Sequence, residues 1–417
     1  MTKKIIYGFF AFAILGAVAC EQSFTAEETT LQAKRLKSEE LNKQYNYSRV
    51  QVKKGFETQA NFLTVDDPSK DKHSFFQTTL KEGNDIQIKS VSDAKAKLGR
   101  VLFYDQKLSL NNATSCGSCH HQSKGFADGL KFSPGFEGKT TIRNSMSIAN
   151  PAMSHSGLFW DRRENSVLSM SLRPIQNHIE MGMEDLSLLE RKLAAIDYYP
   201  TLFKDAYPSN PIITQKNISE AIAAFVRSMV SWDSKFDQGV KSDFANFTPE
   251  ELRGKEIFMG KVSSTTNNNF FNVDQGACAG CHNAPMFNDG SNLFTTSAYD
   301  DNGDNGNGRG VSIGLDKTSS DIGTGDGSFK IPTLRNIELT APYMHDGRFA
   351  TLEEVVTHYN EKVQPSKNLH RKLKDDSGKP KKLNLTPADQ KALVAFMKTL
   401  TDKQFVTDPK FSDPFEN

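Results

Sequence analysis

Apolar side chains recur at helical spacing in several parts of the chain, whereas the alternation of apolar and polar positions that marks a strand is scarce. Three apolar faces are formed by Leu98, Val101 and Leu102, by Ile218, Ile222, Phe225, Val226 and Met229, and by Leu393, Phe396, Met397 and Leu400. The third face belongs to a helix that we expect to begin at "TPADQ". The pattern predicts a mainly α-helical protein.

Two further segments carry the signals of a helix start. In "TPEELRGKEIF", Thr248 is expected to be the N-cap, Pro249 the first helical residue and Glu251 the partner in a capping box. Thr351 and Glu354 predict the same box at the start of a second helix. That second helix would carry Leu352, Val355, Val356 and Tyr359 on one face.

The helices group into two blocks, which we expect at about residues 94–245 and 246–405, followed by a short tail at 406–417. Residues 20–93 are polar and charged and are expected to form an N-terminal extension that spaces the folded body from a membrane. The segment "DDNGDNGNGRG" (300–310) cannot be a regular element. Its acidic and amide side chains could bind calcium, but a solvated loop is the simpler interpretation.

The first twenty residues, "MTKKIIYGFFAFAILGAVAC", contain two lysines and then an apolar run of fifteen residues. This run is too short to span a bilayer, so residues 1–19 predict the signal peptide of an exported, periplasmic protein. Cys20 stands where a bacterial lipobox places the cysteine that carries the lipid, which would make the protein a membrane-anchored lipoprotein. The alternative is an ordinary signal peptide with an incidental cysteine.

The charge balance limits the class of partner. Removal of residues 1–19 would leave 49 basic and 50 acidic residues. A balance so close to neutral argues against nucleic acid as a partner. At 417 residues, the chain is long enough for two domains with full hydrophobic cores.

The four cysteines beyond Cys20 form two pairs, and a histidine follows each pair directly. The two motifs are "CGSCH", with Cys116, Cys119 and His120, and "CAGCH", with Cys278, Cys281 and His282. C-x-x-C-H is the attachment motif of c-type haem. Its two thiols can add to the two vinyl groups of one porphyrin, and the adjacent histidine reaches the iron. We therefore expect two covalently bound haem c groups.

Three other uses of cysteine explain the motifs less well. A structural zinc site would need both pairs together, and in such modules the pairs usually lie fifteen to twenty residues apart rather than 162. A redox C-x-x-C pair does not require the following histidine. A disulfide in an exported protein would also leave both histidines unexplained.

The surrounding sequence resembles the bacterial di-haem cytochrome c peroxidase and MauG family. The resemblance is carried, in the family's order, by "LGRVLFYDQKLS", "GFADG", "RNS" (143–145), "FWDRR" (159–163), "IEMG" (179–182) and "PTLRNIELTAPYMHDG" (332–347). It covers about residues 94–402. It implies a mainly α fold with two cytochrome c-like helical domains, each with one covalently bound c-type haem.

The resemblance also implies roles for single residues. His120 would be the proximal ligand of the peroxidatic haem, and His282 that of the electron-transfer haem. Trp160 matches the tryptophan between the two haems, where an indole could relay electrons; the alternative is a packed core aromatic. Glu180 matches the distal glutamate, which would take a proton from one peroxide oxygen and return it to the other. The alternative is a surface glutamate in the acidic run "EMGMED".

Two more features come from the comparison with the family pattern. Asn144 and the backbone carbonyls of Thr340 and Pro342 resemble an interdomain calcium site, and oxygen ligands suit that ion. Family members with an inactive resting state close the peroxidatic haem with a second histidine on the loop after the first motif. Between His121 and "RNS" this chain has none, and His155 lies outside that loop. We therefore expect the first haem to be open without reductive activation.

The sixth ligand of the second haem has two candidates in "MHDGRFATLEEVVTHYN" (344–360). Fourteen residues after His345, where the peroxidases carry the ligand methionine, this chain has Tyr359, as MauG does. Met344 is the rival, and core packing is the alternative for either side chain. A phenolate lowers the potential of the iron, whereas a thioether raises it. Neither His345 nor His358 is favoured.

The resemblance implies a peroxidase that reduces hydrogen peroxide to water with electrons from a small periplasmic donor such as cytochrome c or a cupredoxin. One alternative is a MauG-like enzyme that oxidises protein side chains through a high-valent di-haem state. Another is an electron-transfer cytochrome without catalysis, which would need both irons six-coordinate. Family members are often dimeric, so a homodimer is compatible with the sequence.

Overall fold

We describe the fold from a computed structural model, which describes residues 34–51, 85–87, 91–151, 157–240, 242–260, 278–282, 312–325 and 327–416. The predicted signal peptide, Cys20, His155 and the acidic segment 300–310 lie outside these residues. Within them, no helix is both long and apolar enough to cross a membrane.

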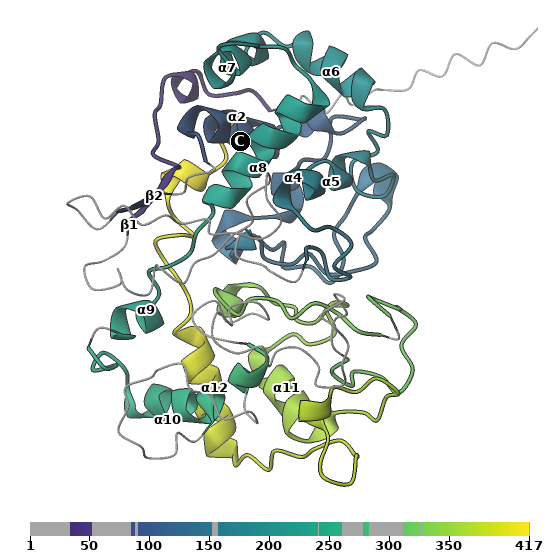
Figure 1. Ribbon diagram of the computed structural model, residues 1–417, viewed down its shortest axis with the longest axis vertical. Helices are drawn as coiled ribbons and strands as arrows, with labels where there is room; N and C mark the ends of the chain where they lie inside the picture. The colour runs from purple at the N-terminus through teal and green to yellow at the C-terminus, as the bar shows by residue number, and fades with distance from the viewer. Residues whose placement is uncertain are drawn as a thin grey trace, which may run out of the picture. The chain divides into compact units, whose positions relative to one another are not determined.

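Helices dominate the described residues, which confirms the predicted fold class (Figure 1). The first group comprises α2 (Asp93–Tyr104), α3 (Cys116–Cys119), α4 (Val167–Met170), α5 (Arg173–Gln176), α6 (Leu186–Ala194), α7 (Tyr199–Ala206) and α8 (Gln215–Ser228). The second comprises α9 (Lys235–Val240), α10 (Pro249–Met259), α11 (Leu352–Thr357) and α12 (Pro387–Lys398). A short antiparallel pair, β1 (Arg49–Gln51) and β2 (Asp85–Gln87), places Val50 opposite Ile86.

The predicted helix starts are confirmed. The Thr248 hydroxyl accepts a hydrogen bond from the backbone N–H of Glu251, whose carboxylate accepts one from the N–H of Thr248. Thr351 and Glu354 form the same reciprocal pair at the start of α11. Each box satisfies two N–H groups that a bare helix end would leave without partners.

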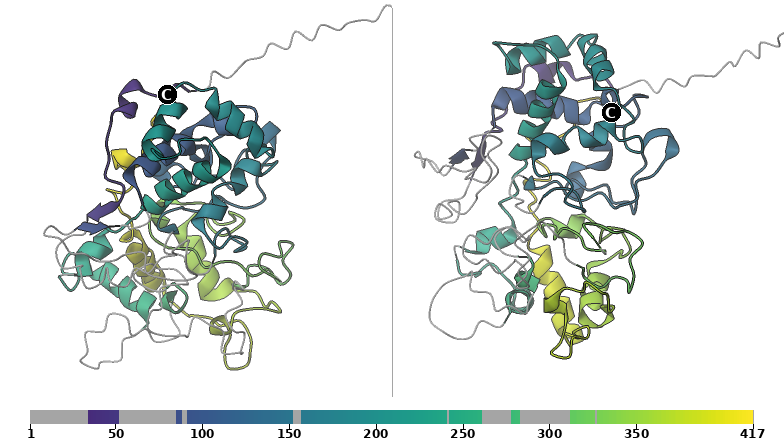
Figure 2. Two further views of the ribbon diagram at one scale, coloured as in Figure 1. Left: turned by 45° about the horizontal axis from the view of Figure 1, so that its top comes forward. Right: turned by 45° about the vertical axis from the view of Figure 1, so that its right-hand side comes forward.

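The buried apolar side chains form two separate cores. The first core is built on α2 and α4–α8 up to Trp232, and Phe405, Phe411 and Phe415 join it from the end of the chain. The second begins at Phe236 and is built on α9–α12. The two groups of helices are distinct in Figure 2 as well. The change of core thus falls at residues 232–236, about ten residues before the predicted boundary.

Each core contains a close helix crossing, and both crossings place a glycine of one helix against an alanine of another. A Cβ placed on Gly99 of α2 would lie 1.9 Å from the carbonyl oxygen of Ala221 in α8. A Cβ on Gly254 of α10 would lie 1.9 Å from the carbonyl oxygen of Ala392 in α12. A phenylalanine follows each glycine by four residues, and each partner helix carries the pattern A-x-x-A-F. Only glycine fits where the helix backbones come this close.

We expect Gly254→Ala to destabilise the protein by about 1–3 kcal/mol, because the new methyl group would meet a backbone carbonyl that cannot move away. The gain in helix propensity, about 1 kcal/mol, is too small to offset this clash. Glu256→Ala, on the exposed side of the same helix, should change stability by no more than about 0.5 kcal/mol. Denaturant unfolding of both variants would test the difference, and equal midpoints would contradict it.

Both ends of the described chain pack on the first core. Tyr47 is fully buried against Phe225 of α8, and Glu40 forms a buried ion pair with Arg100 at 2.8 Å. Phe411 and Phe415, in the predicted C-terminal tail, belong to the same core. The sequence did not indicate these contacts, because isolated apolar residues in a polar stretch give no periodic signal.

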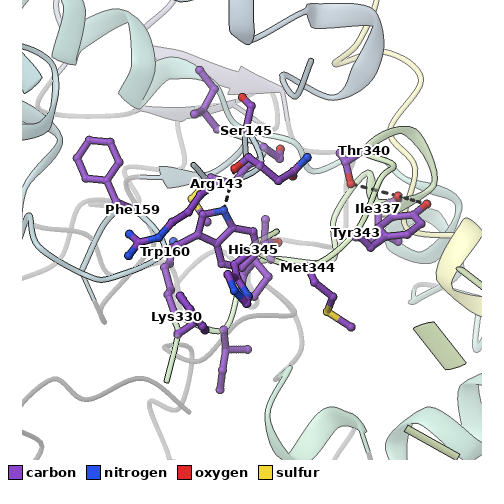
Figure 3. A pocket seen from close by; sticks show the side chains of 18 of the residues that line it. Arg143, Ser145, Phe159, Trp160, Lys330, Ile337, Thr340, Tyr343, Met344 and His345 are labelled. Carbon is purple, nitrogen blue, oxygen red and sulfur yellow. Dashed lines mark hydrogen bonds between the residues drawn. The ribbon is translucent and has the colours of Figure 1, made fainter. Parts of the chain in front are cut away.

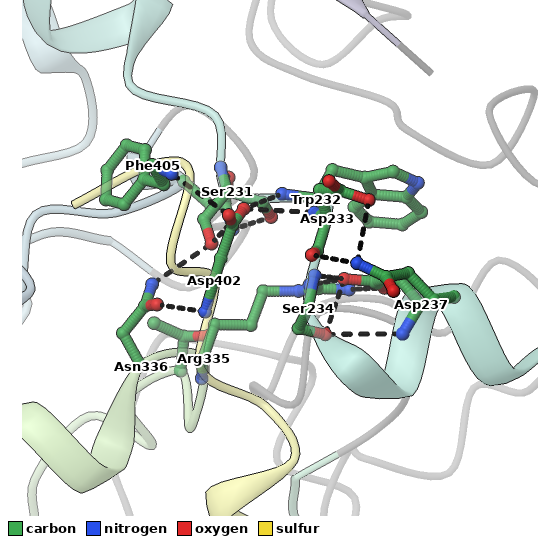
Figure 4. A network of polar contacts seen from close by, with 12 residues as sticks. Ser231, Trp232, Asp233, Ser234, Asp237, Arg335, Asn336, Asp402 and Phe405 are labelled. Atoms are coloured by element: carbon green, nitrogen blue, oxygen red, sulfur yellow. Dashed lines mark hydrogen bonds and ion pairs between the residues drawn. The ribbon is translucent and has the colours of Figure 1, made fainter. Parts of the chain in front are cut away.

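A buried polar network joins the two cores (Figure 4). The carboxylate of Asp402 accepts hydrogen bonds from the backbone N–H groups of Trp232 and Asp233, and the side chain of Asn336 bonds the N–H of Asp402. Arg335 forms a bidentate ion pair with Asp237 at 2.7 and 2.8 Å, and both side chains are almost completely buried. The "PTLRN" motif is thereby fixed at the junction between the cores.

Candidate active site

A cavity of about 640 Å³ receives side chains from both cores. It is lined by all the predicted site residues that the structure describes, namely Cys116, Cys119, His120, Asn144, Trp160, Glu180, Cys278, Cys281, His282, Thr340, Pro342, Met344 and Tyr359. Residues that lie far apart in the sequence therefore face one space. Its lining is largely apolar side chains, which suits a large planar ligand.

The first motif lies on α3, whose start is fixed by a capping box between Ser115 and Ser118. Neither cysteine of this helix forms a disulfide, and both thiols face the cavity. The Nδ1 atom of His120 lies 2.7 Å from the carbonyl oxygen of Phe126. Since a carbonyl only accepts, Nδ1 carries the proton and the lone pair is on Nε2, the arrangement that a metal-binding histidine requires.

The second motif repeats this arrangement. Cys278–Gly280 form a short 3-10 turn, and the backbone N–H of His282 donates to the carbonyl oxygen of Cys278 at 2.9 Å. Nδ1 of His282 lies 3.1 Å from the carbonyl oxygen of Pro332, at the start of "PTLRN". The histidines of both motifs are therefore held in the same tautomer by a backbone carbonyl.

The surroundings of the thiols fit a covalently attached porphyrin. Burial raises the pKa of Cys116 and Cys278 to about 12 and that of Cys119 to about 11, so these thiols are neutral at physiological pH. Across the described ranges, no three His, Cys, Asp or Glu side chains are grouped so as to bind a metal ion. Paired thiols without a disulfide, an oriented histidine and an apolar cavity match haem c in each core.

Comparisons with known proteins identify the family. The sequence profile described as "Di-haem cytochrome c peroxidase" matches residues 93–245. "Methylamine utilization protein MauG" of Methylorubrum extorquens is 30% identical over 316 residues, which cover 73% of this chain and 78% of that protein. "Cytochrome c551 peroxidase" of Nitrosomonas europaea is 31% identical over 312 residues, 74% of this chain and 80% of that one. The chain belongs to the di-haem cytochrome c peroxidase family.

A solved structure supports the assignment. The crystal structure of a MauG-like protein associated with microbial copper homeostasis aligns with a TM-score of 0.62 and 31% identity, over 78% of this chain and 94% of that one. As a di-haem cytochrome c peroxidase family member, the protein is an oxidoreductase with two haem c groups in two cytochrome c-type domains. When bound, the haems supply iron that can exchange electrons.

In this family member, Trp160 connects the two cores (Figure 3). Its indole N–H donates to the carbonyl oxygen of Asn144 at 2.9 Å, and the N–H of Asn144 donates to the carbonyl oxygen of His345 at 2.7 Å. The Trp160 carbonyl accepts from the N–H of Lys330 at 2.8 Å. The rings of Trp160 and His345 meet edge to face at 6.4 Å. The tryptophan is thus fixed to the segment that follows the second motif.

An ion-pair chain beside Trp160 was missed by the sequence analysis. Arg143 binds Asp161 at 2.5 Å and, through two nitrogens, Asp321 at 2.7 and 2.8 Å. The hydrogen bonds from Arg143 hold the pKa of Asp321 below its usual range. Arg143 and Asp321 are 178 residues apart, so no local pattern could have predicted the pair.

Glu180 lies on the turn that follows α5, where Asn177 organises the backbone. The carbonyl of Asn177 accepts from the N–H groups of Glu180 and the two following residues, and its side-chain amide donates to Oε1 of Glu180 at 3.1 Å. Burial raises the pKa of Glu180, and the positive charge of Arg163 partly opposes this shift. A half-buried carboxyl with a raised pKa is well suited to exchange a proton.

Both candidates for the sixth ligand of the second haem line the cavity. Tyr359 lies in a π-helical turn, His358–Lys362, and its ring meets that of His358 edge to face at 5.2 Å. Burial raises the pKa of Tyr359, and the thiols of Cys281 and Cys278 add to the shift. Met344 has a left-handed backbone, with φ of +75°, on the loop shown in Figure 3. His358, which the sequence did not favour as a ligand, has its Nε2 atom 3.1 Å from the carbonyl oxygen of Ile313.

Proposed function

We propose that the protein reduces hydrogen peroxide to water with electrons from a small redox protein in the periplasm. The observation that carries this proposal is the Glu180 carboxyl, which lines one cavity with the Cys116–His120 motif. The 31% identity to a cytochrome c551 peroxidase supports the same activity.

Within this proposal, Nε2 of His120 and of His282 would each hold an iron from one side. The Glu180 carboxylate would accept a proton from one oxygen of the peroxide and return it to the oxygen that leaves as water. The Asn177 amide would keep that carboxylate in place. Trp160, hydrogen-bonded between segments of the two cores, would lie on the route of the electrons.

The experiment that tests the function is a steady-state assay of the oxidised and the reduced holoprotein with hydrogen peroxide and a reduced monohaem cytochrome c. Residues 122–142 contain no histidine, so we expect turnover without prior reduction. Electron paramagnetic resonance of the oxidised protein should show one high-spin and one low-spin ferric signal. Two low-spin signals, with activity only after reduction, would contradict the open first site.

A second candidate function is the MauG-like oxidation of a protein side chain, with steps of the same kind at Glu180 and Trp160. The 30% identity to a MauG protein and the tyrosine at position 359 favour it. Absence of steady cytochrome oxidation, together with a long-lived spectral change after peroxide addition, would support this candidate. A protein that does not react with peroxide at all would be an electron carrier.

We expect Tyr359→Phe to change the low-spin ferric signal and to raise the midpoint potential of the second haem by roughly 0.1 V or more, because loss of a phenolate ligand removes stabilisation of ferric iron. Met344→Leu should leave both unchanged. The control is Tyr343→Phe, whose hydroxyl donates to the carbonyl of Ile337. The opposite result for the Tyr359 and Met344 variants would assign the ligand to Met344.

Three further parts of the proposal concern calcium, the domain limits and the anchor. Asn144, Thr340 and Pro342 line the same cavity, which supports one calcium ion bound by their oxygens. Metal analysis of the purified holoprotein tests this.

For the domain limits, each core would carry one haem, so limited proteolysis should cut the chain between the two cores first. Mass spectrometry of the mature N-terminus would show whether Cys20 carries a lipid.

A further inference from the structure

The loop between α11 and α12 holds an unusual share of the positive charge. Residues 362–382 contain eight lysine or arginine residues and two aspartates. The rest of the chain has 43 basic and 48 acidic residues. A protein that is almost neutral as a whole therefore has a strongly basic segment and an acidic remainder. Such a charge distribution acts on partners at a distance.

The inner side of this loop covers the second haem motif. Nζ of Lys372 donates a hydrogen bond to the carbonyl oxygen of Gly280, within "CAGCH" itself. His370, Lys372 and Leu373 line the same cavity as Cys278 and Cys281. In Figure 1 the loop is the yellow-green segment that leads from α11 to α12.

The outer side of the loop presents lysines to solvent. Lys362, Lys379 and Lys382 are exposed, and Lys374 and Lys381 are half-exposed. None of these five forms an ion pair within the part of the chain that the structure describes. We call these five residues the basic surface.

The backbone beneath the basic surface is ordered. Lys374 and Pro380 form an antiparallel bridge, and the Asp375 carboxylate accepts from the N–H groups of Ser377 and Lys379 at 2.9 and 3.0 Å. The turn therefore fixes the backbone from which several of these lysine side chains extend. A pre-formed charged surface binds a partner with less loss of conformational entropy.

We propose that the basic surface is the docking site of the electron donor, and that the donor is a small redox protein with carboxylates around its exposed redox centre. Complementary charge speeds association and orients the partner, here toward the second haem motif. The inference rests on the proposed function. Two donor molecules would each lose one electron per hydrogen peroxide, which with two protons yields two waters.

The experiment compares the holoprotein with the variant K379E/K381E/K382E. The probes are two reduced monohaem cytochromes c of similar size and potential, one acidic and one basic. At low ionic strength the second-order rate constant for oxidation of the acidic cytochrome should fall by about tenfold or more in the variant. The same rate constant of the unaltered protein should decrease as salt is added. The matched control, K204E/K216E/K403E, reverses three exposed lysines on the first core and should keep the rate.

A second assay separates failure of the docking site from failure of the function. In it the donor is a small dye radical that needs no docking, and the triple variant should reduce peroxide with this donor at the unaltered rate. Equal rates of both variants with the acidic cytochrome would overturn the docking site alone. Absence of peroxide reduction with the dye would overturn the function. If the triple variant loses only its binding to vesicles with anionic lipid, the basic surface is a membrane contact and the docking proposal is wrong.

Discussion

Glu180→Gln is expected to lower the turnover number with hydrogen peroxide by roughly 10²–10⁴-fold, the usual contribution of a positioned acid–base group. Glutamine keeps the size of the side chain and can still bond Asn177, but it cannot accept and return a proton. The Soret spectrum and the haem content should stay unchanged, because Glu180 lies outside both attachment motifs. Stopped-flow mixing with peroxide gives the rate directly.

The control is Glu184→Gln, an exposed glutamate in the same acidic run, which should keep full activity. Because burial raises the pKa of Glu180, the carboxylate is lost at a higher pH than in an exposed glutamate as the pH falls. Turnover should therefore decline on the acid side with a midpoint above about 4.3, the ordinary glutamate value. A Gln variant with unaltered turnover would remove Glu180 from the chemistry.

Arg335→Met should lower the free energy of unfolding by about 3–5 kcal/mol, because it leaves the carboxylate of Asp237 buried without its cation. Arg335 is 0% exposed and Asp237 is 1% exposed, so water cannot replace the missing partner. The double variant R335M/D237N should be more stable than R335M, since it also removes the stranded charge. Guanidinium unfolding followed by circular dichroism measures all three proteins.

The matched control is Arg253→Met. Arg253 also pairs with an aspartate, Asp389, but its side chain is 48% exposed. Water and salt weaken such a pair, and the expected loss is no more than about 1 kcal/mol. If the two methionine variants lost the same stability, the polar junction between the cores would not be the stabilising element that its burial indicates.

Much of the fold was predictable because its signals are local. The capping box of Thr248 and Glu251 spans one helical turn, and the apolar face from Ile218 to Val226 lies within one helix. The covalent chemistry was predictable for the same reason, since each C-x-x-C-H motif holds two thiols and the histidine within five residues. In such local patterns the interacting residues are close neighbours in the sequence, so the pattern by itself predicts the structure.

The remainder depends on contacts that the chain makes only after folding. Tyr47 could not be assigned to the first core, because the surface of α8 that covers it is about 170 residues away. The choice between Tyr359 and Met344 depends on which of two side chains in one cavity reaches the iron. The basic surface was visible only as a run of lysines until the structure placed its loop against "CAGCH".

The two glycine crossings give both cores the same internal frame. Gly99 meets Ala221 and Gly254 meets Ala392 at the same distance, and phenylalanines in the same pattern flank both crossings. Because only glycine fits at either crossing, any larger residue at position 99 should disturb the first core as Gly254→Ala disturbs the second. Trp160, Glu180 and the lysine-rich loop lie outside both crossings, so the residues of the candidate site can be exchanged without altering either frame.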